Sequence, residues 1–212
     1  MTIDKFILIG DTHFGIKNFN EAFFKNQLKL FNEQIFPYMK DNNIEYIIQT
    51  GDLFDNRVTI DINFLDIFMK NFVNILEEKN IKLVTILGNH DVYFKNRIDV
   101  NLSKYISKMT NNIITIQQQE TINFNDKNVL LVPWLTESDK IIYDKQDIII
   151  GHFEIKNFQL TKGNIDTKSV LDEDYFNKLK VSKIYSGHYH INQQNGKIHY
   201  VGTPYELNWG DF

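Results

Sequence analysis

The chain has 212 residues, of which 42% are hydrophobic and 14% aromatic, and its formal net charge is −4. This length and apolar content predict one domain with a full core and exclude a disordered chain. The absence of cysteine excludes disulfides and thiolate metal sites, which leaves nitrogen and oxygen side chains as metal ligands. No apolar run approaches the about 20 residues of a membrane span, and residues 1–5 lack a signal-peptide pattern, so we expect a cytoplasmic protein.

Strand-like and helix-like segments alternate through the first half of the chain. Apolar runs predict strands at 6–9, 45–49 and 82–87, and apolar residues spaced three or four apart predict helices at 20–39 and 62–79. Pro37 is expected to disturb the last turn of the first helix because proline cannot donate a helical hydrogen bond. This alternation predicts an α/β architecture.

The second half is richer in predicted strands. Short segments at 113–116, 121–124 and 129–132 are separated by polar turns and predict an antiparallel meander. Two further strands are expected at 147–150 and 183–186. Asn195-Gly196 predicts a two-residue hairpin turn between the flanking strand segments. The sequence shows no internal repeat and no flexible linker, so one domain is the simplest interpretation.

Five of the six histidines belong to short motifs, and each motif follows a strand-like run. Imidazole and carboxylate groups gathered at the same end of successive strands are what a two-metal hydrolytic site needs. His199 lies outside the motifs, alternates with apolar neighbours and is expected to be structural. The motifs are Asp11-Thr12-His13, Gly51-Asp52-Leu53-Phe54-Asp55, Gly88-Asn89-His90-Asp91, Gly151-His152 and Gly187-His188-Tyr189-His190.

Each motif by itself is a weak signal. Gly51-Asp52 is also typical of a capped turn, and alternate residues such as Asp11 and His13 face the same way for many reasons. His188 and His190 are more specific, because they place two imidazoles on one face of an extended segment. The alternative is that these residues are caps and core histidines, but five such motifs in one order favour a metal site.

The ordered motifs resemble those of the calcineurin-like metallophosphoesterase superfamily, and most closely its nuclease branch of SbcD-type and T-even phage recombination endonuclease subunits. The resemblance also covers Val132-Pro133-Trp134, Gly151-His152-Phe153-Glu154 and the tail 202–207. It implies a four-layer α/β/β/α sandwich with two mixed sheets and the motifs at the carboxyl ends of strands. Residues 1–212 would form the nuclease domain, without the capping domain and ATPase-binding tail that follow in relatives.

The resemblance also implies a site that binds two divalent cations, with Mn²⁺ suited to mixed imidazole and oxygen ligands. Asp52 would bridge the two cations. Asp55 takes a place that holds Asp in bacterial and phage members and His in others. The other implied ligands are Asp11, His13 and His190 for the first cation and Asn89, His152 and His188 for the second.

Residues beside the ligands receive further roles from the resemblance. His90 would contact the scissile phosphate and assist the leaving oxygen, as the catalytic residue. Asp91 could fix the tautomer of His90, with plain turn capping as the alternative. Four basic residues follow metal motifs and could contact DNA phosphates, with solvated loop charges as the alternative. These residues are Lys17, Arg57, Lys95 and Arg97.

The predicted function is metal-dependent hydrolysis of DNA phosphodiesters, as an exonuclease or endonuclease in end processing, recombination or repair. The resemblance implies an SMC-like ATPase partner, a homodimer formed by helices after the early motifs, and the host cytoplasm for a phage or viral protein. One alternative is a phosphoesterase of the same fold that acts on phosphoproteins or cyclic nucleotides. The other is a catalytically inactive scaffold, but all expected ligands are intact.

Overall fold

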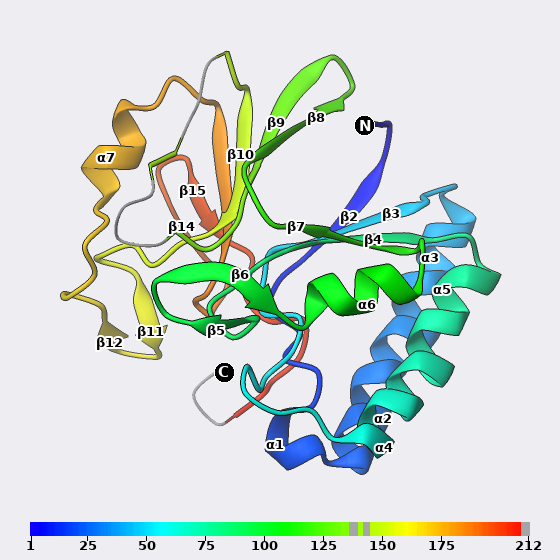
Figure 1. Cartoon of the computed structure of the whole chain (residues 1–212). Helices are drawn as coiled ribbons and strands as arrows, with labels where there is room; N and C mark the ends of the chain where they lie inside the picture. Colours follow the sequence, from blue (N-terminus) through cyan, green and yellow to red (C-terminus); the bar gives the residue numbers. More distant parts are fainter. Residues whose placement is uncertain (136–139, 142–144, 209–212) are drawn as a thin grey trace.

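Two β-sheets pack face to face, and helices cover the outer face of the first sheet (Figure 1). The computed structural model describes residues 1–135, 140–141 and 145–208. In spatial order, the first sheet consists of β2 (Phe6–Ile9), β3 (Tyr46–Gln49), β4 (Lys82–Ile86) and β7 (Ile113–Ile116). The second consists of β1 (Thr2–Ile3), β8 (Glu120–Phe124), β9 (Lys127–Val132), β10 (Ile148–His152), β13 (Lys183–Gly187), β15 (Ile198–Tyr200) and β14 (Gln193–Asn195).

Successive side chains along a strand point to opposite faces of its sheet, so the molecule has three apolar cores: one between the sheets and one outside each sheet. These three cores lie between the four predicted layers. Ile47 packs with the helices outside the first sheet, whereas the next residue, Ile48, lies between the two sheets. In the second sheet, Ile150 faces the space between the sheets, and Ile149 packs outward against Phe176 of α7 (Glu173–Lys178). The period-two pattern of a strand therefore assigns neighbouring residues to different cores.

All neighbouring strands of the first sheet are parallel, whereas the second sheet is mixed. The expected antiparallel meander of three strands is wrong in its first member. β7 pairs in parallel with β4 in the first sheet, and only β8 and β9 form an antiparallel hairpin. Short apolar strands with polar turns look alike in sequence, so the pattern could not show that the chain changes sheets between 116 and 120.

Each of the two long predicted helices contains a π-helical turn. The first runs from α2 (Glu21–Leu30) through Phe31–Ile35 to α3 (Phe36–Asp41), and the second from α4 (Ile62–Phe68) through Met69–Val73 to α5 (Asn74–Glu78). The wider turn in the first helix directly precedes Pro37, whose ring would crowd the carbonyl four residues earlier. The helix nevertheless continues past Pro37 to Asp41, so the proline does not end it. The second helix contains the same kind of turn without a proline.

Side-chain caps begin both long helices, close to where the sequence predicts the helices to start. The Asn20 side chain accepts a hydrogen bond from the Phe23 backbone N–H at 2.9 Å, and Asp61 accepts one from Phe64 at 2.8 Å. Such caps satisfy backbone donors that lack a helical partner. Sequence patterns did not predict the shorter elements α1 (Ile16–Phe19), β5 (Val92–Phe94), β6 (Arg97–Asn101), α6 (Ser103–Met109), β11 (Gln159–Thr161), β12 (Asn164–Ile165) and α7.

Candidate metal centre

The five motifs meet because each follows or ends a strand within its sheet. β2, β3 and β4 run parallel, so the loops that carry Asp11, Asp52 and Asn89 leave the same edge of the first sheet. β10 ends at His152, and His188 follows β13 directly. The carboxyl ends of parallel strands are the usual place for a site in such sheets. Here the contacts between side chains show that both sheets contribute to one site.

The first group of candidate ligands combines Asp11, His13 and His190. Their candidate ligand atoms all lie within 4.8 Å of one another. Asp11 Oδ2 accepts a hydrogen bond from the backbone N–H of His188 at 2.9 Å. Asp11 Oδ1 and His13 Nε2 are buried and have no hydrogen-bond partner among the described residues. Buried polar atoms without partners are costly, so this group suits a cation that would satisfy them.

The second group combines Asn89, His152 and His188. Asn89 Oδ1 lies 2.9 Å from His152 Nε2 and 2.9 Å from His188 Nδ1. His152 Nδ1 donates to the Thr50 carbonyl at 2.9 Å, and burial lowers the pKa of His152. The neutral ring therefore has its Nε2 lone pair beside the Asn89 oxygen, where both atoms could bind one cation. Neighbouring ligands of an octahedral cation with bonds of about 2.1 Å lie about 3 Å apart, which this spacing matches.

Asp52 lies between the two groups. Its Oδ2 is 3.6 Å from His13 Nε2 and 3.5 Å from His152 Nε2, while its Oδ1 accepts a hydrogen bond from the His90 backbone N–H at 2.7 Å. Burial raises the pKa of Asp52, but the charge of nearby histidines, His13 in particular, and the His90 backbone N–H outweigh it and lower that pKa to about 2. Asp52 is therefore an ionised carboxylate that lies between one histidine of each group.

The two groups differ in the charge that they favour. Burial lowers the pKa of His13, but the carboxylates of Asp55, Asp52 and Asp11 outweigh it and raise that pKa to about 9. Burial and the neighbouring His152 lower the pKa of His188 to about 3. The carboxylates around His13 thus stabilise a positive charge, and His188 is held neutral as a nitrogen donor.

Backbone geometry explains why glycines precede several ligands. A Cβ atom added to Gly88 would lie 2.2 Å from Asp52 Oδ1, and one added to Gly187 would lie 2.3 Å from Asp11 Oδ1. Three candidate ligands also have left-handed φ angles, which are rare for residues other than glycine: 44° for His13, 55° for Asp52 and 89° for His188. Such strain persists only where surrounding contacts over-determine it, and it clusters at functional sites.

His90 and Asp91 have separate contacts. His90 Nδ1 donates to the Asp55 carbonyl at 2.7 Å, and its ring packs edge-on against His13 with centroids 4.8 Å apart. The Asp91 carboxylate accepts hydrogen bonds from the backbone N–H groups of Asp52 and Gly88, both at 2.8 Å. These contacts match the turn-capping alternative for Asp91. The group that fixes the tautomer of His90 is the Asp55 carbonyl and not Asp91.

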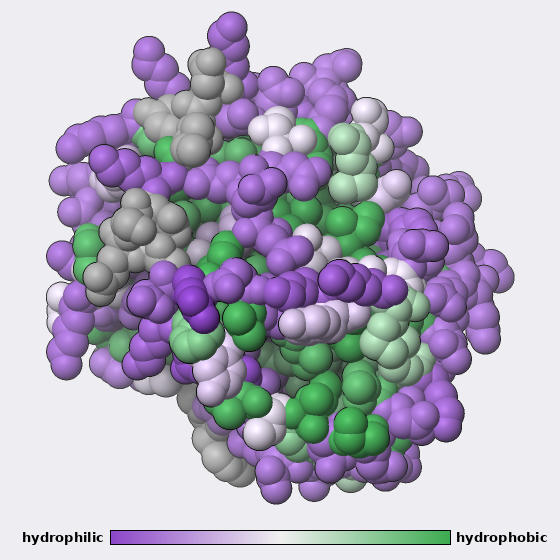
Figure 2. Space-filling model, in the orientation of Figure 1, coloured by the Kyte–Doolittle hydropathy of each residue, from purple (hydrophilic) through white to green (hydrophobic). Residues whose placement is uncertain are grey.

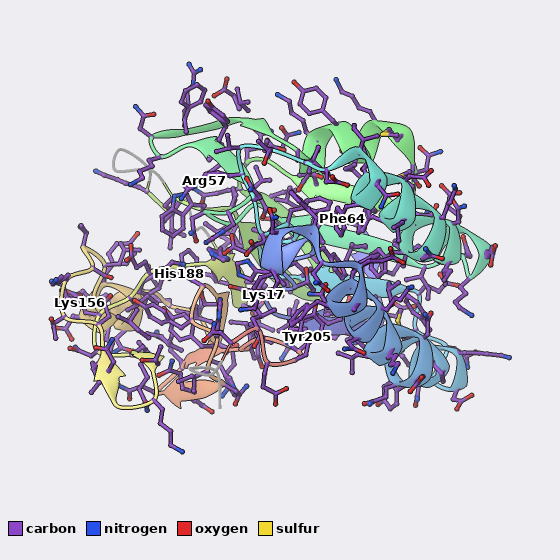
Figure 3. The ribbon with its side chains drawn as sticks, turned by 90° about the horizontal axis from the view of Figure 1, so that it is seen from below. Lys17, Arg57, Phe64, Lys156, His188 and Tyr205 are labelled. Atoms are coloured by element: carbon purple, nitrogen blue, oxygen red, sulfur yellow. The ribbon has the colours of Figure 1, made fainter. Side chains whose placement is uncertain are left out.

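The four predicted DNA contacts are not equivalent. Arg97 lies on the β5–β6 hairpin, where Asp99 holds its Nε at 3.2 Å and its guanidinium lies 4.0 Å from the centre of the Phe94 ring. Lys17 and Lys95 are exposed and Arg57 is half-buried. In the view of Figure 3, His188 lies between Lys17 and Lys156, with Arg57 above it. Lys156, which lies four residues after His152, was not predicted as a DNA contact from the sequence.

Two aromatic residues support the ligands and received no firm role from the sequence. The Trp134 ring lies 5.4 Å from the His188 ring and 5.9 Å from the His152 ring, measured between centroids, so it packs on the second group. In the tail, the Tyr205 hydroxyl donates to the Thr12 carbonyl at 2.7 Å, between two ligands of the first group. Only the resemblance of the tail and of the Val-Pro-Trp segment could have indicated these contacts.

The chain belongs to the calcineurin-like phosphoesterase family, whose model matches residues 4–192. Exonuclease subunit 1 of Enterobacteria phage T4 is 30% identical over 213 residues, which cover 98% of this chain and 61% of that protein. This similarity confirms the predicted resemblance to the phage nuclease branch. A putative phosphoesterase of Invertebrate iridescent virus 3 is 26% identical over 131 residues, which cover 61% of this chain and 35% of that protein.

The chain therefore spans about three fifths of the T4 protein and about a third of the iridescent virus protein. A solved structure of a protein of unknown function from Aquifex aeolicus matches with a TM-score of 0.39 and 16% identity, over 95% of this chain and 89% of that one. Family membership makes the protein a metallophosphoesterase, a hydrolase class that uses divalent metals. Within the described residues, none of the helices has the length and apolar character needed to span a bilayer.

Proposed function

We propose that the protein hydrolyses DNA phosphodiesters with two divalent cations, of which Mn²⁺ suits the ligands best. The observation that carries this proposal is the position of Asp52 Oδ2, about equally far from one histidine of each ligand group. The first cation would be held by Asp11, His13 and His190, and the second by the Asn89 group. When bound, such a pair of cations polarises the phosphodiester and acidifies a water molecule for in-line attack.

The residues of the chain provide binding, orientation and a proton. Asn89 and the histidines are neutral ligands, so the loaded site keeps a net positive charge that attracts a phosphodiester. His90 is the proposed catalytic residue. Because its Nδ1 donates to the Asp55 carbonyl, Nε2 is the ring atom left to carry a proton to the leaving oxygen. Lys17, Arg57 and Lys95 are proposed to hold DNA phosphates beside the site.

DNA is favoured over phosphoproteins and cyclic nucleotides by the T4 relative, which is named as an exonuclease subunit. The same name supports a multi-subunit nuclease, in which an SMC-like ATPase is the proposed partner in DNA end processing, recombination or repair. The host cytoplasm is the proposed location if the protein comes from a phage or virus. The negative net charge does not oppose DNA binding, because bound cations supply positive charge where the phosphate lies.

Cleavage should depend on the metal. We expect linear duplex or single-stranded DNA to be cleaved with Mn²⁺, more weakly with Mg²⁺ alone, and not at all with excess chelator. Mg²⁺ should be weaker because it demands near-ideal octahedral oxygen ligation, whereas this site offers several imidazoles. The assay should include a chromogenic phosphodiester, a phosphoserine peptide and a cyclic nucleotide. Undiminished DNA cleavage in chelator would refute the mechanism, and preferential turnover of the peptide or cyclic nucleotide would favour the rival function.

A homodimer is proposed through the helices that follow the early motifs. Large apolar side chains are exposed on or beside α4 and α6: Val58 by 63%, Ile62 by 75%, Tyr105 by 52% and Met109 by 59%. Figure 2 shows an apolar area in the lower right of this face, in the region of these helices. Exposed large apolar side chains gathered on one face often mark an interaction site.

Replacing Ile62 with Asp should convert the homodimer to a monomer, because a buried unpaired charge opposes association. The measurement is sedimentation velocity over a range of protein concentrations. Val170→Asp is the matched control, since Val170 is 91% exposed and lies on the segment before α7. A wild-type protein that sediments as a monomer at all concentrations would exclude the homodimer for this chain.

A further inference from the structure

Tyr189 lies between the two histidines of the last motif and takes no part in the ligand groups. Its side chain is 2% exposed, and its ring packs against Tyr200 with centroids 4.7 Å apart, in the apolar core outside the second sheet. The Tyr189 ring also packs against the His188 ring, with centroids 5.0 Å apart. Whatever fixes Tyr189 therefore also limits the direction of the His188 ring and of the short bend that continues to His190.

Asp166 is the residue that fixes the Tyr189 hydroxyl. The hydroxyl donates to Asp166 Oδ2 at 2.6 Å, and the Ser169 hydroxyl donates to the same oxygen. The other oxygen, Oδ1, accepts from the backbone N–H groups of Lys168 and Ser169 at 2.7 and 3.3 Å. Burial raises the pKa of Asp166, but these hydrogen bonds outweigh it and lower that pKa to about 2. Both carboxylate oxygens of Asp166 are thus held by hydrogen bonds that do not involve Tyr189.

A second pair of hydrogen bonds fastens the same two segments together. The Gln159 backbone N–H donates to Gln193 Oε1 at 2.8 Å, and Gln193 Nε2 donates to the Gln159 carbonyl at 2.8 Å. Asp166 is joined to the start of this hairpin, because its backbone N–H donates to the Phe158 carbonyl at 2.9 Å. The β11–β12 hairpin and its flanks are therefore attached to the chain both before His190 and after it.

We propose that Asp166 and Ser169 are positioning residues that act through Tyr189 to hold His188 and His190 in their metal-binding directions. This rests on the proposed metal site. The need for such support is visible at His188, whose left-handed φ of 89° is strained for a residue with a side chain. Neither Asp166 nor Ser169 contacts a ligand side chain in the described contacts, so their effect would pass only through Tyr189.

The test is the affinity of the chelator-stripped protein for Mn²⁺, measured by titration calorimetry. Tyr189→Phe removes one hydroxyl and keeps the ring, and it should weaken Mn²⁺ binding about 10–100-fold, as loss of an outer ligand partner typically does. Asp166→Asn should weaken binding in the same direction. The double variant should bind Mn²⁺ no more weakly than the weaker-binding single variant. Both changes interrupt the same path from Asp166 through Tyr189 to the histidines. Ser169→Ala provides a milder change if a variant fails to fold.

Thr110→Val is the matched control, because it also removes a buried hydroxyl. Thr110 is 6% exposed, and its hydroxyl donates to Glu77 Oε1 at 2.5 Å near the start of β7, at the end of the first sheet away from the ligands. It should lower the melting temperature of the metal-free protein without changing Mn²⁺ affinity. A purely structural role for Tyr189 would give the same pattern as this control.

Binding of Mn²⁺ within twofold of wild type in Tyr189→Phe, Asp166→Asn and Ser169→Ala would overturn the proposal. That result leaves the proposed function intact if the wild-type protein still cleaves DNA with Mn²⁺. Conversely, a wild-type protein that binds Mn²⁺ and fails to cleave DNA would remove the proposed function, while weaker Mn²⁺ binding in the variants would still support the positioning role.

Discussion

The His188→Ala protein should lose bound metal and hydrolytic activity together. His188 Nδ1 lies 2.9 Å from Asn89 Oδ1, and the ring is held neutral, so it is a principal nitrogen donor of the second group. Its removal should weaken metal binding by more than the about 10–100-fold that is typical of outer partners. Metal content by elemental analysis after gel filtration should fall from two ions to about one, and cleavage should fall to background.

His199→Ala is the control for this variant. His199 lies on β15, and its ring packs against Tyr185 with centroids 5.7 Å apart, away from both ligand groups. It should retain two ions and nearly full activity. Should His188→Ala also retain two ions, His188 is not a ligand and the second group must be reassigned.

The His90→Ala protein should show the opposite combination, with both ions bound and slow cleavage. The backbone N–H of His90 donates to Asp52, and its ring packs edge-on against His13. Its Nδ1 donates to the Asp55 carbonyl and is therefore not available to bind metal. Loss of a positioned acid typically costs about 10²–10⁴ in rate. DNA affinity should change little, because the effect belongs to the transition state.

Measuring metal content beside single-turnover cleavage separates these two roles. If the His90→Ala protein is depleted of metal, His90 is a ligand. Because its ring packs against the His13 ring, it would then belong to the first group. His90→Gln is a useful companion variant, since it keeps a polar side chain of similar length and cannot carry the proton at Nε2. It should bind both ions and remain slow.

The sequence predicted the candidate site better than the residues that support it. Asp52 follows the apolar strand β3 after two residues, and His152 is the last residue of β10. Parallel pairing brings the ends of such strands to one edge within each sheet. The contacts of Asp55, Trp134 and Tyr189 depend on loops that fold back across the two sheets. Nothing in their local spacing specifies those partners. The motifs could therefore be located from short-range pattern, whereas the assignment of ligands rests on the resemblance and stays a prediction. The residues that support the motifs required tertiary structure.

A similar division holds for the fold. Caps at Asn20 and Asp61 and the Asn195-Gly196 turn are local signals, and the structure has elements that begin or turn at these positions. The placement of 113–116 beside β4 was missed, because a short apolar strand carries no mark of the sheet that it joins. The π-helical turns were missed as well, since one extra residue hardly changes the apolar spacing of a helix.

The central claim is that one site holds two cations bridged by Asp52. Anomalous diffraction from crystals grown with Mn²⁺ tests it most directly. We expect two peaks about 3.5–4 Å apart, one among Asp11, His13 and His190 and the other among Asn89, His152 and His188, with Asp52 between them. A single peak, or peaks away from Asp52, would contradict the claim.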